Sequence, residues 1–305
     1  MAMTLVCRVW PIVSQVAGCW LAGVVASQPT TAAAQGVIAA PQAIPTAQQI
    51  SSPDQSENTG DDFDLPLNLF QLMYAYKTAP GAGAVRGTIR EVTTDTINLR
   101  VDHPIDLDSQ WTLGLRSDLP LLAKNPLSSE NPTGDYRYGA GDADFQAALI
   151  HDFDARWTAG FGARLIAPTG DDILGSGKWQ IMPGFAVRYA LSEVSSNSYL
   201  EPLVRYDFGF AGPSTKNISN LQFAPTFNVS LPDRWFVTFY PSADIRVNYG
   251  DPVAGQTGRL FLPFDARIGR KLTDDLALSL EVSVPIIKDY PVYDFKTEVR
   301  LNLKF

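Results

Sequence analysis

Charged side chains that alternate with apolar ones are the residues of this chain that could do chemistry. Arginine, aspartate and glutamate recur at every second position, as in Arg205-Tyr206-Asp207. If such residues line a water-filled passage, they select small solutes by charge, and an arginine-rich bore would favour anions. If they pair with one another, they stiffen the wall instead. Both roles stay open from the sequence. The candidate lumen and selectivity residues are Arg116, Arg164, Arg188, Arg205, Arg246, Arg267, Asp207, Asp244, Asp265 and Glu281.

Catalysis and metal binding have few candidates. The chain has two histidines, His103 and His151, and neither has a serine two or three residues away, as a histidine-dependent hydrolase could use. The two cysteines, Cys7 and Cys19, both lie near the start of the chain, where they are expected to be removed with a leader. The glycine-rich segment 168–179 lacks the spacing of a phosphate-binding loop. We therefore expect no catalytic residue, metal site or cofactor.

The alternation itself predicts the strands that would position the charged residues. In the closing segment 294–305, Val299, Leu301 and Leu303 fall on one side, and Glu298 and Arg300 fall on the other. About twelve such segments follow one another from residue 63 to the end, as an even-numbered outer-membrane barrel requires. They are expected at 65–77, 86–101, 110–116, 144–149, 156–165, 179–191, 201–210, 221–230, 235–249, 260–268, 276–286 and 294–305. In the first of them the phase shifts near Phe70, which suggests a bulge.

Long and short connections alternate between these segments. The longer ones are expected at 78–85, 119–138, 168–177, 211–219, 250–258 and 285–294. The shorter ones are expected at 102–109, 152–155, 192–198, 232–234 and 271–275. Long outer loops and short periplasmic turns are typical of membrane barrels. The predicted fold class is therefore all-β: a transmembrane antiparallel up-and-down β-barrel of about twelve strands over residues 63–305.

The start of the chain has the features of export to the bacterial outer membrane. Residues 1–34 read as a signal peptide, with Arg8, an apolar run from 9 to 26 and small residues at 32–34. Lipidation at Cys19 is the alternative to cleavage near Ala34. Residues 35–62, rich in Ala, Gln, Pro and Ser, are expected to form a disordered periplasmic tail. A formal net charge of −8 argues against nucleic acid as a partner.

The closing segment and three short motifs resemble known outer-membrane proteins. The closing segment ends on Phe305 and resembles the last strand of bacterial outer-membrane barrels, which implies recognition by the barrel assembly machinery. The segments 138–144 (YGAGDAD), 167–171 (APTGD) and 174–179 (LGSGKW) look like the "MetA-pathway of phenol degradation" family of outer-membrane transporters. That resemblance covers about residues 63–305. It implies passage of small, aromatic or apolar compounds and defines no catalytic residues.

Together these features predict a passive channel or transporter for small solutes, either small anions or small aromatic and apolar compounds. Its expected partners are outer-membrane lipids, the assembly machinery and the solutes. The alternatives are an outer-membrane lipid-modifying enzyme and a closed structural barrel.

Overall fold

The computed structural model describes residues 67–171 and 173–305, so the expected signal peptide and tail lie outside the described residues. Within the described ranges, no helix has the length and apolar character needed to cross a membrane. The strands are β1 (Leu69–Ala82), β2 (Ile89–Asp106), β3 (Trp111–Lys124), β4 (Arg137–Ala140), β5 (Ala143–Asp152), β6 (Trp157–Ala167), β7 (Trp179–Ala190), β8 (Tyr199–Ala211), β9 (Ser219–Ser230), β10 (Trp235–Phe239), β11 (Ile245–Asn248), β12 (Leu260–Lys271), β13 (Leu276–Lys288) and β14 (Phe295–Lys304). The 3-10 turn η1 (Pro232–Arg234) precedes β10.

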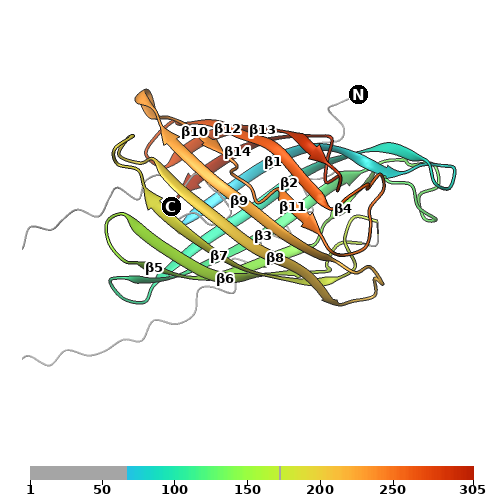
Figure 1. Cartoon of the computed structure of the whole chain (residues 1–305), viewed down its shortest axis with the longest axis horizontal. Coiled ribbons are helices and arrows are strands. Elements are labelled where there is room, and N and C mark those ends of the chain that lie inside the picture. Colours follow the sequence, from blue (N-terminus) through green and yellow to red (C-terminus); the bar gives the residue numbers. More distant parts are fainter. Residues whose placement is uncertain (1–66, 172) are drawn as a thin grey trace, which may run out of the picture. The chain divides into compact units, whose positions relative to one another are not determined.

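These strands form one closed antiparallel barrel (Figure 1). The sheet closes because β1 pairs with both β2 and β14. Strands β4 and β5 follow one another along the same edge of β3. Strands β10 and β11 likewise lie in line between β9 and β12. Counting each of these two pairs as one strand gives twelve barrel strands, which confirms the expected fold and strand number.

The barrel has an apolar outer face and a polar inner face. On β14, Val299, Leu301 and Leu303 are exposed on the outside, whereas Glu298 and Arg300 face inward and are buried. The same alternation runs through β8 and β9. An apolar exterior matches a hydrocarbon surrounding, and a closed sheet leaves no unpaired strand edge in it.

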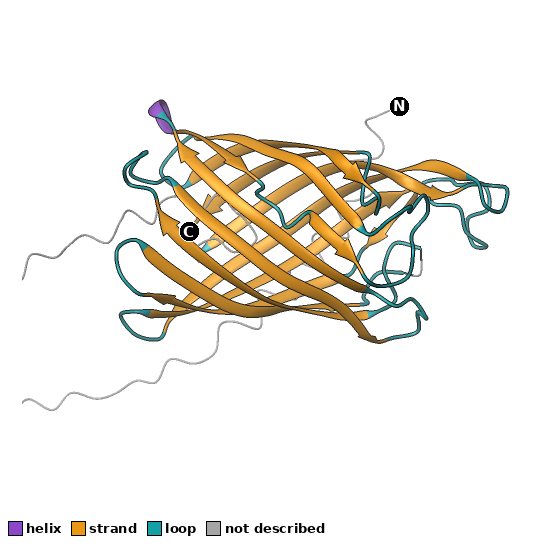
Figure 2. Ribbon diagram, viewed as in Figure 1, coloured by secondary structure: helices purple, strands orange, loops and turns teal. Residues whose placement is uncertain are grey.

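Short turns lie at one end of the barrel and longer loops at the other (Figure 2). The turn end carries residues 107–110, 153–156 and 272–275, together with η1 and the last residue of the chain. The loop end carries the longer connections 125–136 and 168–178. The alternation of long and short connections is thus as expected.

Two of the turns are built alike around an aspartate. The Asp108 carboxylate accepts hydrogen bonds from the backbone N–H groups of Gln110 and Trp111, both at 2.8 Å. Asp154 does the same for Arg156 and Trp157, at 2.7 and 2.9 Å. These donors hold the pKa of both carboxyl groups below its usual range. Each turn thereby places a tryptophan at the first position of the next strand, near the expected membrane interface.

The bulge expected near Phe70 is absent from the described strand, and that prediction is wrong. The pairing of β1 with β14 runs without a shift from Leu69 to Thr78. Leu69 faces the barrel interior and is only 2% exposed. This apolar residue on the inner face made the apolar–polar alternation look shifted in the sequence, although the strand itself is regular. The irregularities lie elsewhere, in β7 between Trp179 and Gln180, in β12 between Leu262 and Pro263 and in the wall between β10 and β11.

The wall between β10 and β11 is interrupted at residues 240–244. Phe239 pairs with Phe227 and Ile245 pairs with Phe223, so residues 240–244 lie opposite the shorter segment 224–226 of β9. The chain turns at Tyr240, whose φ of 52° is in the left-handed region. This interruption brings Ser242 and Asp244 into the cluster of charged side chains described next.

Candidate functional site in the barrel lumen

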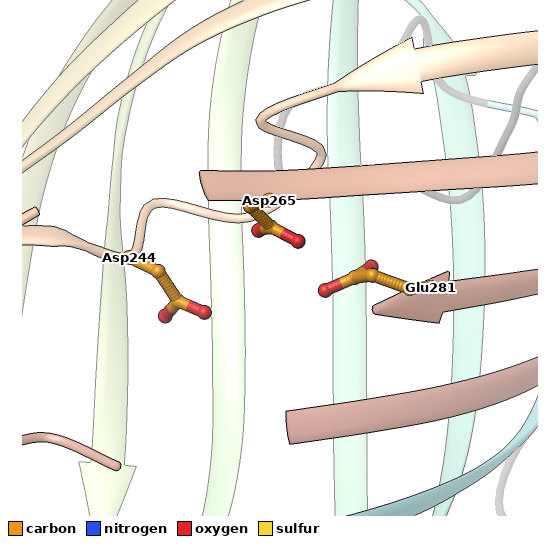
Figure 3. Close-up of side chains that lie close together, drawn as sticks. All are labelled: Asp244, Asp265 and Glu281. Carbon is orange, nitrogen blue, oxygen red and sulfur yellow. The ribbon is translucent and has the colours of Figure 1, made fainter. Parts of the chain in front are cut away.

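A cluster of acidic side chains surrounds one lysine on the inner face of the barrel. Asp244 comes from the wall interruption, Asp265 from β12 and Glu281 from β13, and Figure 3 shows their carboxylates pointing toward one another. The Lys296 ammonium, from β14, lies 2.6 Å from Asp244 Oδ2 and 2.5 Å from Glu281 Oε1. Its distance to Asp265 Oδ2 is 3.8 Å. One cation therefore bridges acidic residues from three parts of the wall.

Further cations and hydroxyl groups complete this acidic cluster. Arg300 donates to Glu281 Oε2 at 2.9 Å and pairs with Glu298. Arg246 lies 3.0 Å from Asp244 Oδ1. The Tyr293 hydroxyl donates to Asp244 Oδ2 at 3.2 Å. Three cations, Lys296, Arg300 and Arg246, thus pair with the acidic residues of the cluster, and such pairing offsets the cost of burying charge.

The three carboxylates could by spacing hold a metal ion. One oxygen from each of Asp244, Asp265 and Glu281 lies within 4.8 Å of the others. Lys296 already places its ammonium between two of them and supplies the positive charge that a metal would bring. The arrangement therefore fits an internal ion-pair network better than a metal centre.

A second network joins β2 and β3. Arg116 donates to both oxygens of Asp102, at 2.8 and 2.7 Å. Arg100 donates to Asp118 at 2.7 Å. Because Asp102 pairs in register with Arg116 and Arg100 with Asp118, the two ion pairs are next to each other and run in opposite directions.

The expected selectivity residues all lie on the inner face, but their accessibility differs. Arg116, Arg205, Arg267, Asp207, Asp244, Asp265 and Glu281 are buried. The more accessible side chains are Arg164 at 11%, Arg188 at 15% and Arg246 at 26% exposure. Arg164 lies 3.6 Å from Asp144, and Arg188 lies 3.5 Å from Glu201. Seven of the ten expected residues are therefore buried on the inner face, and three are more accessible.

The candidate list omitted Lys296 and Tyr293. Lys296 stands on the polar side of the closing segment, so its inward direction was predictable, but its three acidic neighbours come from distant segments. Tyr293 belongs to the connection 289–294, which lies within the outer loop expected at 285–294. Its ring packs edge-on against Phe261 at 4.7 Å, and its hydroxyl lies 2.6 Å from the Ser283 hydroxyl. This loop therefore reaches into the lumen.

Both histidines lie at the turn end, in or next to the short connections that were expected at 102–109 and 152–155. His103 Nδ1 lies 2.7 Å from Asn68 Oδ1. The His151 ring lies between Trp111, at 4.3 Å, and Phe153, at 4.5 Å. Their described neighbours are thus an amide and aromatic rings, which fits polar turn residues.

Comparisons with known proteins agree with this architecture. A family model described as "Putative MetA-pathway of phenol degradation" matches residues 75–284. The COG4313 outer membrane channel from Pseudomonas putida F1 superimposes with a TM-score of 0.62 at 16% identity, over 82% of this chain and 99% of that one. The NanC porin has a TM-score of 0.45 at 10% identity, over 77% and 98%. Outer membrane phospholipase A from Escherichia coli has 0.42 at 11% identity, over 83% and 96%. No curated protein matches the chain.

Proposed function

The chain belongs to the MetA-pathway of phenol degradation family, and from that premise we propose that it is a passive channel for small solutes in the bacterial outer membrane. The observation that carries the proposal is the closed twelve-strand barrel with an apolar exterior and a charged interior. A barrel of this size is wider than the filled eight-stranded barrels and narrower than the sixteen-stranded porins. It suits solutes of low molecular mass that move down their own gradient.

The charged interior supports discrimination among these solutes. Buried charges hold the wall in place, whereas the more accessible charges meet the solute. On this proposal Arg164, Arg188 and Arg246 are the selectivity residues among those expected from the sequence. Small anions and small aromatic or apolar compounds are the two solute classes that the channel would serve.

The barrel would lie in outer-membrane lipid and would reach it by export and assisted assembly. The exposed apolar residues of the outer face would contact lipid, and the chain would be exported by an N-terminal signal peptide. Phe305, which is 69% exposed, would be read by the barrel assembly machinery. No catalytic residue is assigned.

Single-channel recording in planar bilayers tests the proposal. Refolded protein should give stable ohmic current steps, with ion preference measured from the reversal potential in a salt gradient. Arg188→Ala and Arg246→Ala should each lower the preference for anions. Arg234→Ala is the matched control, because Arg234 lies in the turn η1 at the turn end.

Two other outcomes would replace the channel by its alternatives. A folded barrel without conductance would favour a closed structural barrel. Lipid hydrolysis that is lost in His103→Ala or His151→Ala would favour a lipid-modifying enzyme.

A further inference from the structure

Two lysines on the inner face stand apart from the ion-pair networks. Lys77 of β1 and Lys124 of β3 are partly accessible. Among residues 67–171 and 173–305, neither forms an ion pair or a side-chain hydrogen bond. Lys296, in contrast, is buried against carboxylates. Two ammonium charges of the lumen are therefore left without a counter-ion from the described chain.

The strand register places these lysines side by side. Lys77 pairs with Lys296 across β1 and β14. On its other side Lys77 pairs with Thr94 of β2, and Thr94 pairs with Lys124. Directly paired residues share one face of the sheet, with Cβ atoms about 5 Å apart. We call Lys296, Lys77, Thr94 and Lys124 the lysine row.

The surroundings of the lysine row leave it positive. The charged groups that act most strongly on Lys77 are three cations, Lys124, Arg246 and Lys296, and the carboxylate of Asp244. That carboxylate is already bound by Lys296 and Arg246. Like charges at neighbouring positions repel, and an incoming anion would relieve the repulsion.

The next row toward the turn end is apolar on β1 and β3. It consists of Glu298, Ala75, Thr96 and Leu122, which pair in register across β14, β1, β2 and β3, and Glu298 is itself paired with Arg300. Met73 follows Ala75 on the same face of β1. A ligand with a carboxylate at one end and an apolar body at the other would find a match for each part, because ammonium groups bind carboxylates and apolar side chains favour apolar contact.

We propose that the lysine row is a binding site for small organic carboxylates on the path through the barrel. The inference rests on the proposed channel function and names the class of solute for it. The carboxylate lies between Lys77 and Lys124, and the apolar body lies over Ala75, Leu122 and Met73.

The test is block of the open channel by added anions. With the full-length refolded chain, benzoate should reduce the single-channel current at lower concentration than acetate or inorganic phosphate. The variant Lys77→Gln/Lys124→Gln should raise the half-blocking concentration of benzoate by about tenfold or more, since it removes two charge-assisted contacts. Lys304→Gln is the matched control, because Lys304 lies on the same strand as Lys296 but pairs with Leu69 at the turn end.

Several outcomes would overturn the site. Unchanged block in the double variant would exclude these lysines while leaving the channel function intact. An equal effect of Lys304→Gln would reduce the site to general lumen charge. Block by phosphate as strong as by benzoate would remove the role of the apolar row.

A second measurement separates this inference from the channel itself. If the protein does not conduct, benzoate binding to the full-length chain in detergent is measured by calorimetry. Binding that the double variant loses would support the site although the channel function had failed. Absence of binding would overturn both.

Discussion

Asp102 and Arg116 form an ion pair on the inner face of β2 and β3. Two parallel hydrogen bonds join them, and their side chains are 4% and 6% exposed. Burial makes such a pair costly to break, because the partner that remains keeps its charge in a poor environment for it. The pair therefore tests whether the lumen networks hold the wall together.

Asp102→Asn should destabilise the barrel by about 3 kcal/mol. The asparagine keeps one acceptor but turns an amide group toward the guanidinium, so one of the two hydrogen bonds is lost. The urea midpoint of the refolded protein measures the change. Glu193→Gln is the control: it breaks an exposed pair with Arg156 in which both side chains are about half accessible, and it should leave the midpoint where it was. Equal midpoints for the two variants would contradict a structural role for the lumen pair.

At the scale of elements, one tyrosine side chain anchors the loop 289–294 in the lumen, in addition to backbone hydrogen bonds such as those from Tyr290 to Leu260 and from Asp294 to Thr78. Tyr293 packs on Phe261 of β12 and shares a hydrogen bond with Ser283 of β13. Its hydroxyl also reaches Asp244 in the wall interruption. A single side chain thus joins a loop, two strands and the interruption.

Tyr293→Ala should release this loop from the lumen. The expected result is faster trypsin cleavage after Lys288, the last residue of β13, because a protease needs a mobile segment. Tyr293→Phe keeps the ring packing and should give an intermediate rate. Cleavage after Lys216, in the loop between β8 and β9, serves as the internal reference and should not change. A rate at Lys288 equal to that of the unaltered protein would show that the loop is held by other contacts.

The strands were predictable because alternation is a local property. On β14 each inward residue differs in polarity from its outward neighbours, so the sequence alone places Glu298 and Arg300 inside. Leu69 was placed wrongly, since an apolar residue facing a packed interior carries no signal of its direction. The inward direction of the expected arginines was predictable, but their partners were not. Lys296 and Asp244 meet only because β14 and the wall interruption are brought together by strand pairings that join distant parts of the chain.

At the scale of the whole molecule, the last residue contributes little to the folded barrel. The Phe305 side chain is largely exposed, and its backbone N–H donates one hydrogen bond, at 3.0 Å, to the carbonyl of Asn68. Its proposed role concerns delivery to the membrane and not stability.

Removal of Phe305 should therefore separate assembly from folding. In cells, the amount of heat-modifiable barrel in the outer-membrane fraction should fall several-fold. In detergent, the truncated protein should refold to the same extent as the complete chain. Phe305→Tyr retains an aromatic end and should assemble normally. Full assembly of the truncated chain in cells would contradict the role of this residue.

The hydrogen bond between Phe305 and Asn68 shows that the first and last strands of the described barrel lie close enough to be joined. The described barrel begins and ends at the same place, with β1 and β14 as direct neighbours. The strand order around the circle therefore does not depend on where the polypeptide is cut. A circularly permuted chain, joined from residue 305 to residue 68 and opened in the turn 272–275, would have the same neighbours throughout. It would end just after Arg270 and Lys271 of β12 instead of on Phe305. The proposed assembly signal would therefore be lost, while the barrel architecture stayed the same.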